Sequence, residues 1–129
     1  MPPITELTRI EPVYLARLER QGVFTTGLLL EVSETAARRQ TLSDHVGATI
    51  NDVAMWRDES LMLNLADYGP NEHLLFIQAG IEGLHDILAV EVDEFGARLR
   101  RAAGELGVDP PDDRRIEGWW DQARTLEEE

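Results

Sequence analysis

Two stretches of the chain decide its fold: LTRIEPVYLARLERQGVFTTGLLL at residues 7–30 and LADYGPNEHLLFIQAGIEGLHDIL at residues 65–88. The second stretch aligns with the first at a constant offset of 58 residues. Six pairs keep this offset: Leu7 with Leu65, Pro12 with Pro70, Gly22 with Gly80, Val23 with Ile81, Leu29 with Ile87, and Leu30 with Leu88. Because self-similarity at a fixed period marks a structural unit that is built more than once, the sequence predicts one small unit in two copies.

The similarity continues beyond these stretches with small gaps. Gly47, in the segment VGAT, matches Gly107 in LGVD, and Trp56 matches Trp119. Copy one then covers about residues 4–58 and copy two about residues 61–126. No low-complexity linker separates them, so we expect residues 1–129 to form a single domain whose two copies are related by a pseudo-twofold axis.

The apolar residues are spaced as in helices almost everywhere. Within residues 93–106, one helical stripe contains Phe95, Leu99, Ala102, Ala103 and Leu106. No stretch alternates apolar and polar residues for long enough to indicate a half-buried strand, and only residues 28–32 are too short to assign. The pattern therefore predicts an all-α fold.

Helix boundaries are marked by residues with known preferences. Pro12 and Pro70 suit a first helical turn, and Gly22 and Gly80 suit the left-handed position after a helix. Ser33, Thr41 and Thr49 each precede a helical pattern and are expected to cap it, Thr49 together with Asp52 three residues later. The proline-rich break at residues 109–113 precedes a last helix at about residues 114–126.

Composition excludes several classes of protein. The formal net charge is −13, all twelve basic residues are Arg, and there is no Cys. Six Arg and nine acids leave residues 1–60 at −3, whereas six Arg and sixteen acids leave residues 61–129 at −10. A field of that sign repels phosphate backbones. Without an apolar run of about 20 residues or a secretory signal, we expect a soluble cytoplasmic protein.

A set of glycine, aliphatic and aromatic positions carries a resemblance to a known family. These are Ile10, Tyr14, Leu18, Gly22, Val23, Thr25, Leu29, Arg39, Leu42, Gly47 and Trp56 in copy one, and Tyr68, Gly69, Leu74, Ala79, Gly80, Ile81, Leu84, Leu88 and Trp119 in copy two. At these positions the chain resembles the bacterial domain of unknown function 4332, a tandem helix-hairpin-helix family. The resemblance implies a fold of paired short helices, and it implies no particular biochemical activity.

No motif points to catalysis or to a cofactor. Walker, GxGxxG, GxSxG and HExxH motifs are absent, and the three His residues lack the spacing of metal ligands. The acidic residues near Asp58 and near Asp112 do not match a calcium-binding loop. We therefore expect neither an enzyme nor a cofactor, metal or small-molecule site.

The sequence favours a non-catalytic interaction module with an acidic helical surface that binds a basic protein or a second copy of the chain. Trp119 and Trp120 are adjacent and cannot both face one core, so one of them is a candidate surface residue. Tyr68 is the third candidate for protein interaction. Helically spaced aromatic residues are more often core residues than binding residues, and that structural interpretation remains open for all three.

The alternative is sequence-independent nucleic-acid binding, which helix-hairpin-helix units often perform through Gly-rich turns. The candidate residues are Arg38, Arg39, Gly47, Arg98, Arg100, Arg101 and Gly107. Against this alternative, the turns at Pro12 and Pro70 have lost glycines and contain acids. Pairing of Arg with neighbouring acids, such as Glu94 with Arg98, is the competing interpretation of the arginines.

Overall fold

The computed structural model describes residues 2–128 and divides into two compact units, unit 1 at Met1–Asn64 and unit 2 at Leu65–Glu129. Its regular structure over the described residues consists of eight α-helices and the short 3₁₀ helix η1, Ile4–Glu6. Those residues form no strand, and their only β pairing is an isolated bridge between Pro3 and Thr25. The predicted all-α fold is confirmed.

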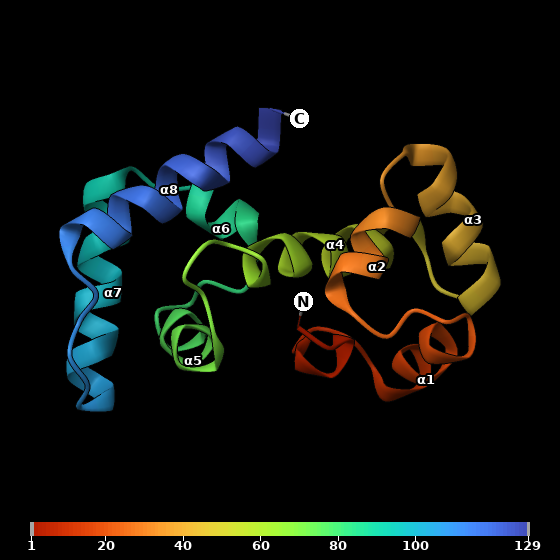
Figure 1. Ribbon diagram of the computed structural model, residues 1–129, viewed down its shortest axis with the longest axis horizontal. Coiled ribbons are helices and arrows are strands. Elements are labelled where there is room, and N and C mark those ends of the chain that lie inside the picture. Colours follow the sequence, from red (N-terminus) through yellow and green to blue (C-terminus); the bar gives the residue numbers. More distant parts are fainter. Residues whose placement is uncertain (1, 129) are drawn as a thin grey trace. The chain divides into compact units, whose positions relative to one another are not determined.

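Unit 1 is built around its last helix. Helix α4 packs against α2 and α3, and α1 packs against α3 (Figure 1). The bounds of the four helices are α1, Pro12–Arg20; α2, Thr26–Val32; α3, Ala36–Val46; and α4, Ile50–Leu63. Residues 28–32, which the sequence left unassigned, therefore belong to a helix.

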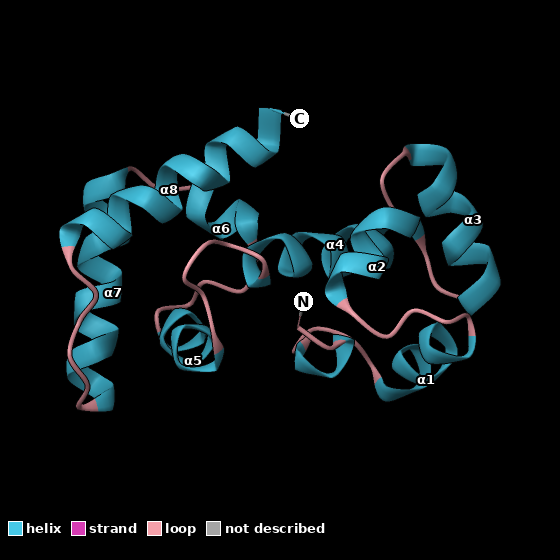
Figure 2. Cartoon of the chain, in the orientation of Figure 1, coloured by secondary structure: helices cyan, strands magenta, loops and turns pink. Residues whose placement is uncertain are grey.

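Unit 2 has the same order of helices and similar pairings. Helix α8 packs against α6 and α7, and α5 packs against α7. The bounds are α5, Pro70–Gln78; α6, Leu84–Leu88; α7, Val92–Leu106; and α8, Asp113–Glu128. Short loops join most of these helices, and a longer extended segment leads from α7 to α8 (Figure 2).

The predicted helix boundaries at proline and glycine are confirmed. Pro12 and Pro70 each occupy the first turn of their helix, where a missing N–H breaks no hydrogen bond. Gly22 has φ 84° and Gly80 has φ 79°, in the left-handed region that glycine adopts without strain.

One predicted cap is confirmed and two are wrong. The Thr49 hydroxyl accepts from the N–H of Asp52, whose carboxylate accepts from the N–H of Thr49 in return. Ser33 follows α2, and its hydroxyl donates to the Leu29 carbonyl, so it does not begin a helix. Thr41 lies inside α3, which Thr35 caps instead. Both wrong predictions have one cause. A Ser or Thr hydroxyl can accept from an N–H at the start of a helix, and it can equally donate to the carbonyl of the preceding helical turn.

The core of unit 1 forms around Trp56 of α4, which is 1% exposed. Its ring lies 5.6 Å from that of Tyr14 in α1. Buried aliphatic residues complete this core: Leu18, Val23, Leu29, Leu42, Val46 and Val53.

A buried carboxylate fastens the N-terminal segment to this core. Glu59 of α4 is fully buried and accepts from the N–H groups of Thr8 and Arg9 and from the Thr8 hydroxyl at 2.6 Å. A buried charge is tolerated only when such bonds replace its hydration.

The core of unit 2 is a cluster of aromatic rings. Phe76 of α5 makes edge-to-face contacts with Phe95 of α7, at 5.7 Å, and with Trp119 of α8, at 5.2 Å. All three side chains are at most 2% exposed. The ring contacts bring three helices of the unit together.

The repeat, the twofold relation and the single domain are finer statements than an all-α fold, and they stay predictions. Within each unit taken alone, four helices surround a buried tryptophan on the last helix.

Replacing Glu59 by Ala is expected to lower the free energy of unfolding by about 2 kcal/mol or more, because three donors lose a charged acceptor. Urea denaturation followed by circular dichroism measures the change. Glu31→Ala, at an exposed position of α2, is the matched control and should be nearly neutral. Equal stability of the two variants would contradict the role assigned to Glu59.

Candidate protein-interaction surface

Two of the three predicted interaction residues belong to the core of unit 2. Trp119 is buried, and its indole N–H donates to the Ala66 carbonyl at 2.8 Å. The half-buried ring of Tyr68 makes edge contacts with Phe76 at 5.0 Å and with Trp119 at 6.5 Å. Anchorage inside the unit therefore accounts for both residues.

Trp120 lies on a different side of α8 from Trp119. Its indole N–H donates to the Val90 carbonyl at 3.0 Å, and the Arg124 guanidinium lies 4.7 Å from the ring centre. The side chain remains half-exposed. Trp120 thus connects α8 to the segment between α6 and α7, and part of its side chain remains in contact with solvent.

A groove of about 570 Å³, here called the α5 groove, runs between α5 and the segment that leads from α7 to α8. Leu74 and Ile77 of α5 line one side, and Leu106 and Val108 line the other. Trp119 also contributes to the lining. The core tryptophan therefore reaches this groove, although it is not itself a free surface residue.

Three large apolar side chains around the α5 groove are exposed to solvent. Leu74 is 64% exposed, Val108 is 52% exposed and Leu106 is 42% exposed. Single exposed aliphatic side chains are common, but three around one groove form the kind of patch that marks a binding surface. Leu106 belongs to the helical stripe predicted from sequence, yet it is exposed while the other four residues of that stripe are buried.

Unit 1 serves as an internal control for this patch. At the 58-residue offset, Leu74, Leu75 and Ile77 correspond to Ala16, Arg17 and Glu19. The Arg17 guanidinium donates to the Val46 carbonyl at 2.8 Å, and it occupies the place where a side chain on Gly47 would lie. Unit 1 therefore folds with polar or small residues at these positions, whereas in unit 2 Leu75 is buried and Leu74 is exposed.

The rim of the α5 groove is acidic. Glu72 and Asp109 line it together with a single cation, Arg115. The Arg115 guanidinium lies 3.6 Å from the Glu72 carboxylate and 4.8 Å from the centre of the Trp119 ring, and it donates to the Asp67 carbonyl. Its charge is thus already engaged inside unit 2, which as a half of the chain is strongly negative.

The arginines predicted as nucleic-acid ligands in unit 1 bind the end of α2. Arg38 donates to the Glu31 carbonyl at 3.0 Å, and Arg39 donates to the Ser33 carbonyl at 2.8 Å. Arg57 of α4 donates to the Leu30 carbonyl at 2.8 Å. The last carbonyls of a helix carry partial negative charge and lack partners within the helix. Three guanidinium groups supply those partners here.

The arginines of unit 2 have different partners. Arg98 pairs with Glu94 at 3.1 Å, which confirms the predicted pair within α7. Arg100 pairs with Asp113 at 3.1 Å. Arg101 is exposed and, among the described residues, makes no hydrogen bond or ion pair.

The two glycine turns are followed by helices that carry their own acids. Gly47 has φ 71° and Gly107 has φ 70°, so both are left-handed helix ends. The first turn of α4 is closed by Thr49 and Asp52, and at the start of α8 the Asp112 carboxylate accepts from the N–H of Arg115 at 2.8 Å. Carboxylates of the chain therefore lie where a phosphate would approach these helices.

Two further features, metal-ligand clusters and membrane-spanning helices, were considered along the described part of the chain, and neither is present. Over the described residues, no group of three or more His, Cys, Asp or Glu side chains is arranged to hold a metal ion. In the same part of the chain, no helix combines the length and the apolar character needed to cross a bilayer.

The apolar residues of the α5 groove were missed by sequence reasoning. Their signal was present in the two aligned stretches, because Leu74 and Ile77 align with Ala16 and Glu19.

Comparison with known proteins assigns the family. A family model described as Domain of unknown function (DUF4332) matches residues 8–126. No curated protein matches the chain, and no solved structure matches it either.

Arg39→Ala is expected to lower the stability of the chain by about 0.5–1 kcal/mol, because α2 loses a cation at its carbonyl end. Thermal unfolding followed by circular dichroism measures the change. Arg101→Ala removes an equal charge from a position without described partners, and we expect no measurable change there. If both variants have the same melting temperature, Arg39 does not have the structural role assigned to it.

Proposed function

We propose that the chain, which belongs to the DUF4332 family, is a non-catalytic interaction module that binds a basic segment of a partner protein in the α5 groove. The observation that carries the proposal is that Leu74, Ile77 and Val108 line this groove at positions where unit 1 has Ala16, Glu19 and Ala48. A surface that folding does not require is explained when a partner covers it.

The proposal includes the finer architecture predicted from the sequence. We infer that each unit is one copy of a tandem helix-hairpin-helix repeat. Left-handed glycines support the inference, since Gly22 and Gly80 follow the first helix of their units, and Gly47 and Gly107 follow the third. The matching helix order within each unit supports it as well.

Energetics favour a partner with apolar side chains. Covering Leu74, Leu106 and Val108 removes apolar surface that the folded chain leaves in water. A fully covered side chain of this size contributes about 1.5–3 kcal/mol. Three of them give a gross contribution large enough to offset part of the cost of ordering a bound segment.

The negative charge around the α5 groove favours basic partners over acidic ones. Glu72 and Asp109 lie on the rim, and the second half of the chain has a formal charge of −10. A segment with Lys or Arg beside its apolar residues is attracted to this field, whereas an acidic segment is repelled. The preferred occupant is therefore an amphipathic basic segment of a protein, and self-association is the second outcome that the experiment below distinguishes.

Nucleic-acid binding is the weaker proposal. The unit 1 arginines are engaged with the end of α2, and the turns after Gly47 and Gly107 are followed by acids of the chain. These contacts hold the unit 1 arginines at the end of α2, and the net charge of −13 opposes the approach of a phosphate backbone.

A basic amphipathic model peptide of Leu and Lys tests the protein-binding proposal. Its titration, followed by backbone amide NMR, should shift residues around Leu74 and Val108. Truncating the groove residues, as Leu74→Ala, Ile77→Ala and Val108→Ala together, should weaken binding at least about tenfold, because about 1.4 kcal/mol or more of apolar contact is lost.

Val13→Ala is the matched control, because Val13 is an exposed aliphatic residue of α1 and lies in unit 1. It should leave peptide affinity unchanged. Equal binding by the triple variant and the parent chain would overturn the proposed site. Equal binding of a Leu and Glu peptide would overturn the charge preference. A monomer–dimer equilibrium that the triple variant abolishes, seen by sedimentation, would assign the groove to a second copy instead.

Duplex DNA tests the alternative directly. At about 50 mM salt, the chain is expected to show no measurable affinity, because its net charge repels phosphate. Fluorescence anisotropy with a labelled duplex measures this. Binding that weakens steeply with added salt, and that Arg38→Ala with Arg39→Ala removes, would favour the nucleic-acid interpretation.

A further inference from the structure

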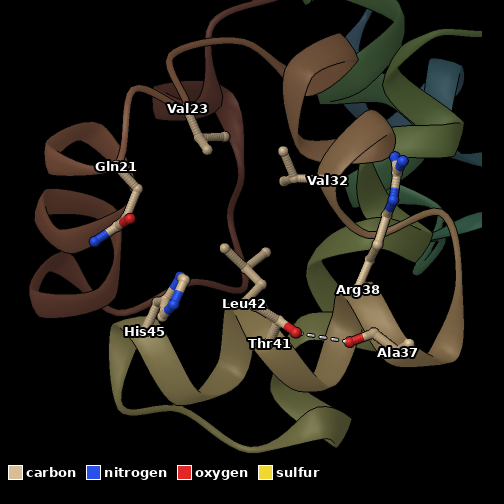
Figure 3. Close-up of a pocket in the computed structure, with 8 residues that line it drawn as sticks. All are labelled: Gln21, Val23, Val32, Ala37, Arg38, Thr41, Leu42 and His45. Atoms are coloured by element: carbon tan, nitrogen blue, oxygen red, sulfur yellow. Dashed lines mark hydrogen bonds between the residues drawn. The ribbon is translucent and has the colours of Figure 1, made fainter.

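A second groove, here called the α3 groove, lies within unit 1 and has different chemistry. It measures about 400 Å³ and is bounded by the loop after α1, the end of α2 and one face of α3 (Figure 3). From α3 it takes Ala37, Arg38, Thr41, Leu42 and His45, which a helical period places on one side. None of these residues lies in the α5 groove.

The floor of the α3 groove is apolar. Val23, Val32 and Leu42 point toward the same space from three different elements (Figure 3). Val23 and Leu42 are buried, so the floor is part of the packed unit. A concavity of a few hundred Å³ with an apolar floor is of the size that small ligands occupy.

The polar residues of the α3 groove offer hydrogen-bond donors, and none of the lining residues is an acid. They are Gln21, Arg38, Thr41 and His45. Figure 3 places Arg38 at one end of the groove beside Val32, and Gln21 with His45 at the other. In a chain with 25 acidic residues, a groove lined by an arginine and no carboxylate is distinct from the surrounding surface.

The Arg38 end of the groove is locally cationic. Arg38, Arg39 and Arg57 all donate to carbonyl groups between Leu30 and Glu34. Burial lowers the pKa of Arg57, the charge of Arg39 lowers that pKa further, and the Glu34 carboxylate partly offsets both effects. The Glu34 carboxylate pairs with Arg38 at 3.6 Å, in a pair that is largely exposed. A second anion would therefore be stabilised here.

Arg38 has donors to spare for such an anion. One of its terminal nitrogens binds the Glu31 carbonyl, but a guanidinium group carries five N–H donors in a fixed plane. A carboxylate suits that plane because it accepts two parallel hydrogen bonds.

We propose that the α3 groove binds a small amphiphilic carboxylate, with its apolar body against Val23, Val32 and Leu42 and its carboxylate on Arg38. Apolar burial supplies most of the affinity, and the guanidinium fixes the orientation and selects an anion over a neutral or cationic amphiphile. The site is independent of the peptide-binding groove of unit 2.

Decanoate is the probe, and its neutral and cationic counterparts, decanol and decyltrimethylammonium, are the comparison ligands. Titration followed by backbone amide NMR should shift the residues of α3 from Ala37 to His45. Decanoate is expected to bind at least about tenfold more tightly than decyltrimethylammonium, the factor that a charge-assisted hydrogen bond supplies.

Two variants distinguish the contribution of the groove's shape to binding from the contribution of the Arg38 charge. Ala37→Trp places a large side chain in the groove from an exposed position and should abolish decanoate binding. Its matched control, Ala36→Trp, lies one residue away outside the lining and should bind as the parent does. Arg38→Gln should reduce decanoate affinity about tenfold and leave decanol affinity unchanged.

The proposal is overturned if decanoate leaves the α3 amides unshifted while the chain is folded. It is also overturned if Ala37→Trp binds decanoate as Ala36→Trp does. Equal affinity of the chain for decanoate and decyltrimethylammonium would contradict the proposed contact between the carboxylate and Arg38. Peptide binding by unit 2 should be unaffected by Ala37→Trp, so failure of either proposed site is recognised separately from failure of the other.

Discussion

The buried tryptophan on the last helix of each unit is the contact on which the rest of the structure depends. Trp56 and Trp119 are at most 2% exposed, and the helices that carry them each pack against two others in their unit. With the large ring in place, three or four short helices share a core that none could form alone. The α3 groove lies away from this contact, whereas Trp119 itself forms part of the lining of the α5 groove.

Sequence predicted the features that depend on local chemistry. The prolines that begin α1 and α5 and the glycines that follow them act through backbone geometry, which a few neighbouring residues determine. Features that depend on distant partners were not predictable in the same way. Arg39 resembled a phosphate ligand until its carbonyl partner near the end of α2 was known. Leu106 continued an apolar stripe, but only the packing of α5 and α8 on α7 determines which residues of that stripe are buried.

The two grooves have opposite chemistry although they belong to similar units. The α5 groove combines exposed apolar side chains with acids, and the α3 groove combines a buried apolar floor with hydrogen-bond donors. The net charge of −13 describes neither surface, because Arg38, Arg39 and Arg57 form a cationic region within an acidic chain. Local placement of charge therefore says more about partners than the total does.

The Arg17 guanidinium, seated over Gly47, has a consequence for how such a chain diverges. In unit 1 a single side chain closes the space beside the turn, and in unit 2 Leu75 takes its position while the space beside Gly107 stays open. The space beside this turn is therefore filled in unit 1 and open in unit 2. Exchanges at a few positions of one helix change the surface beside a glycine turn, while the buried tryptophan that holds each unit together stays in place.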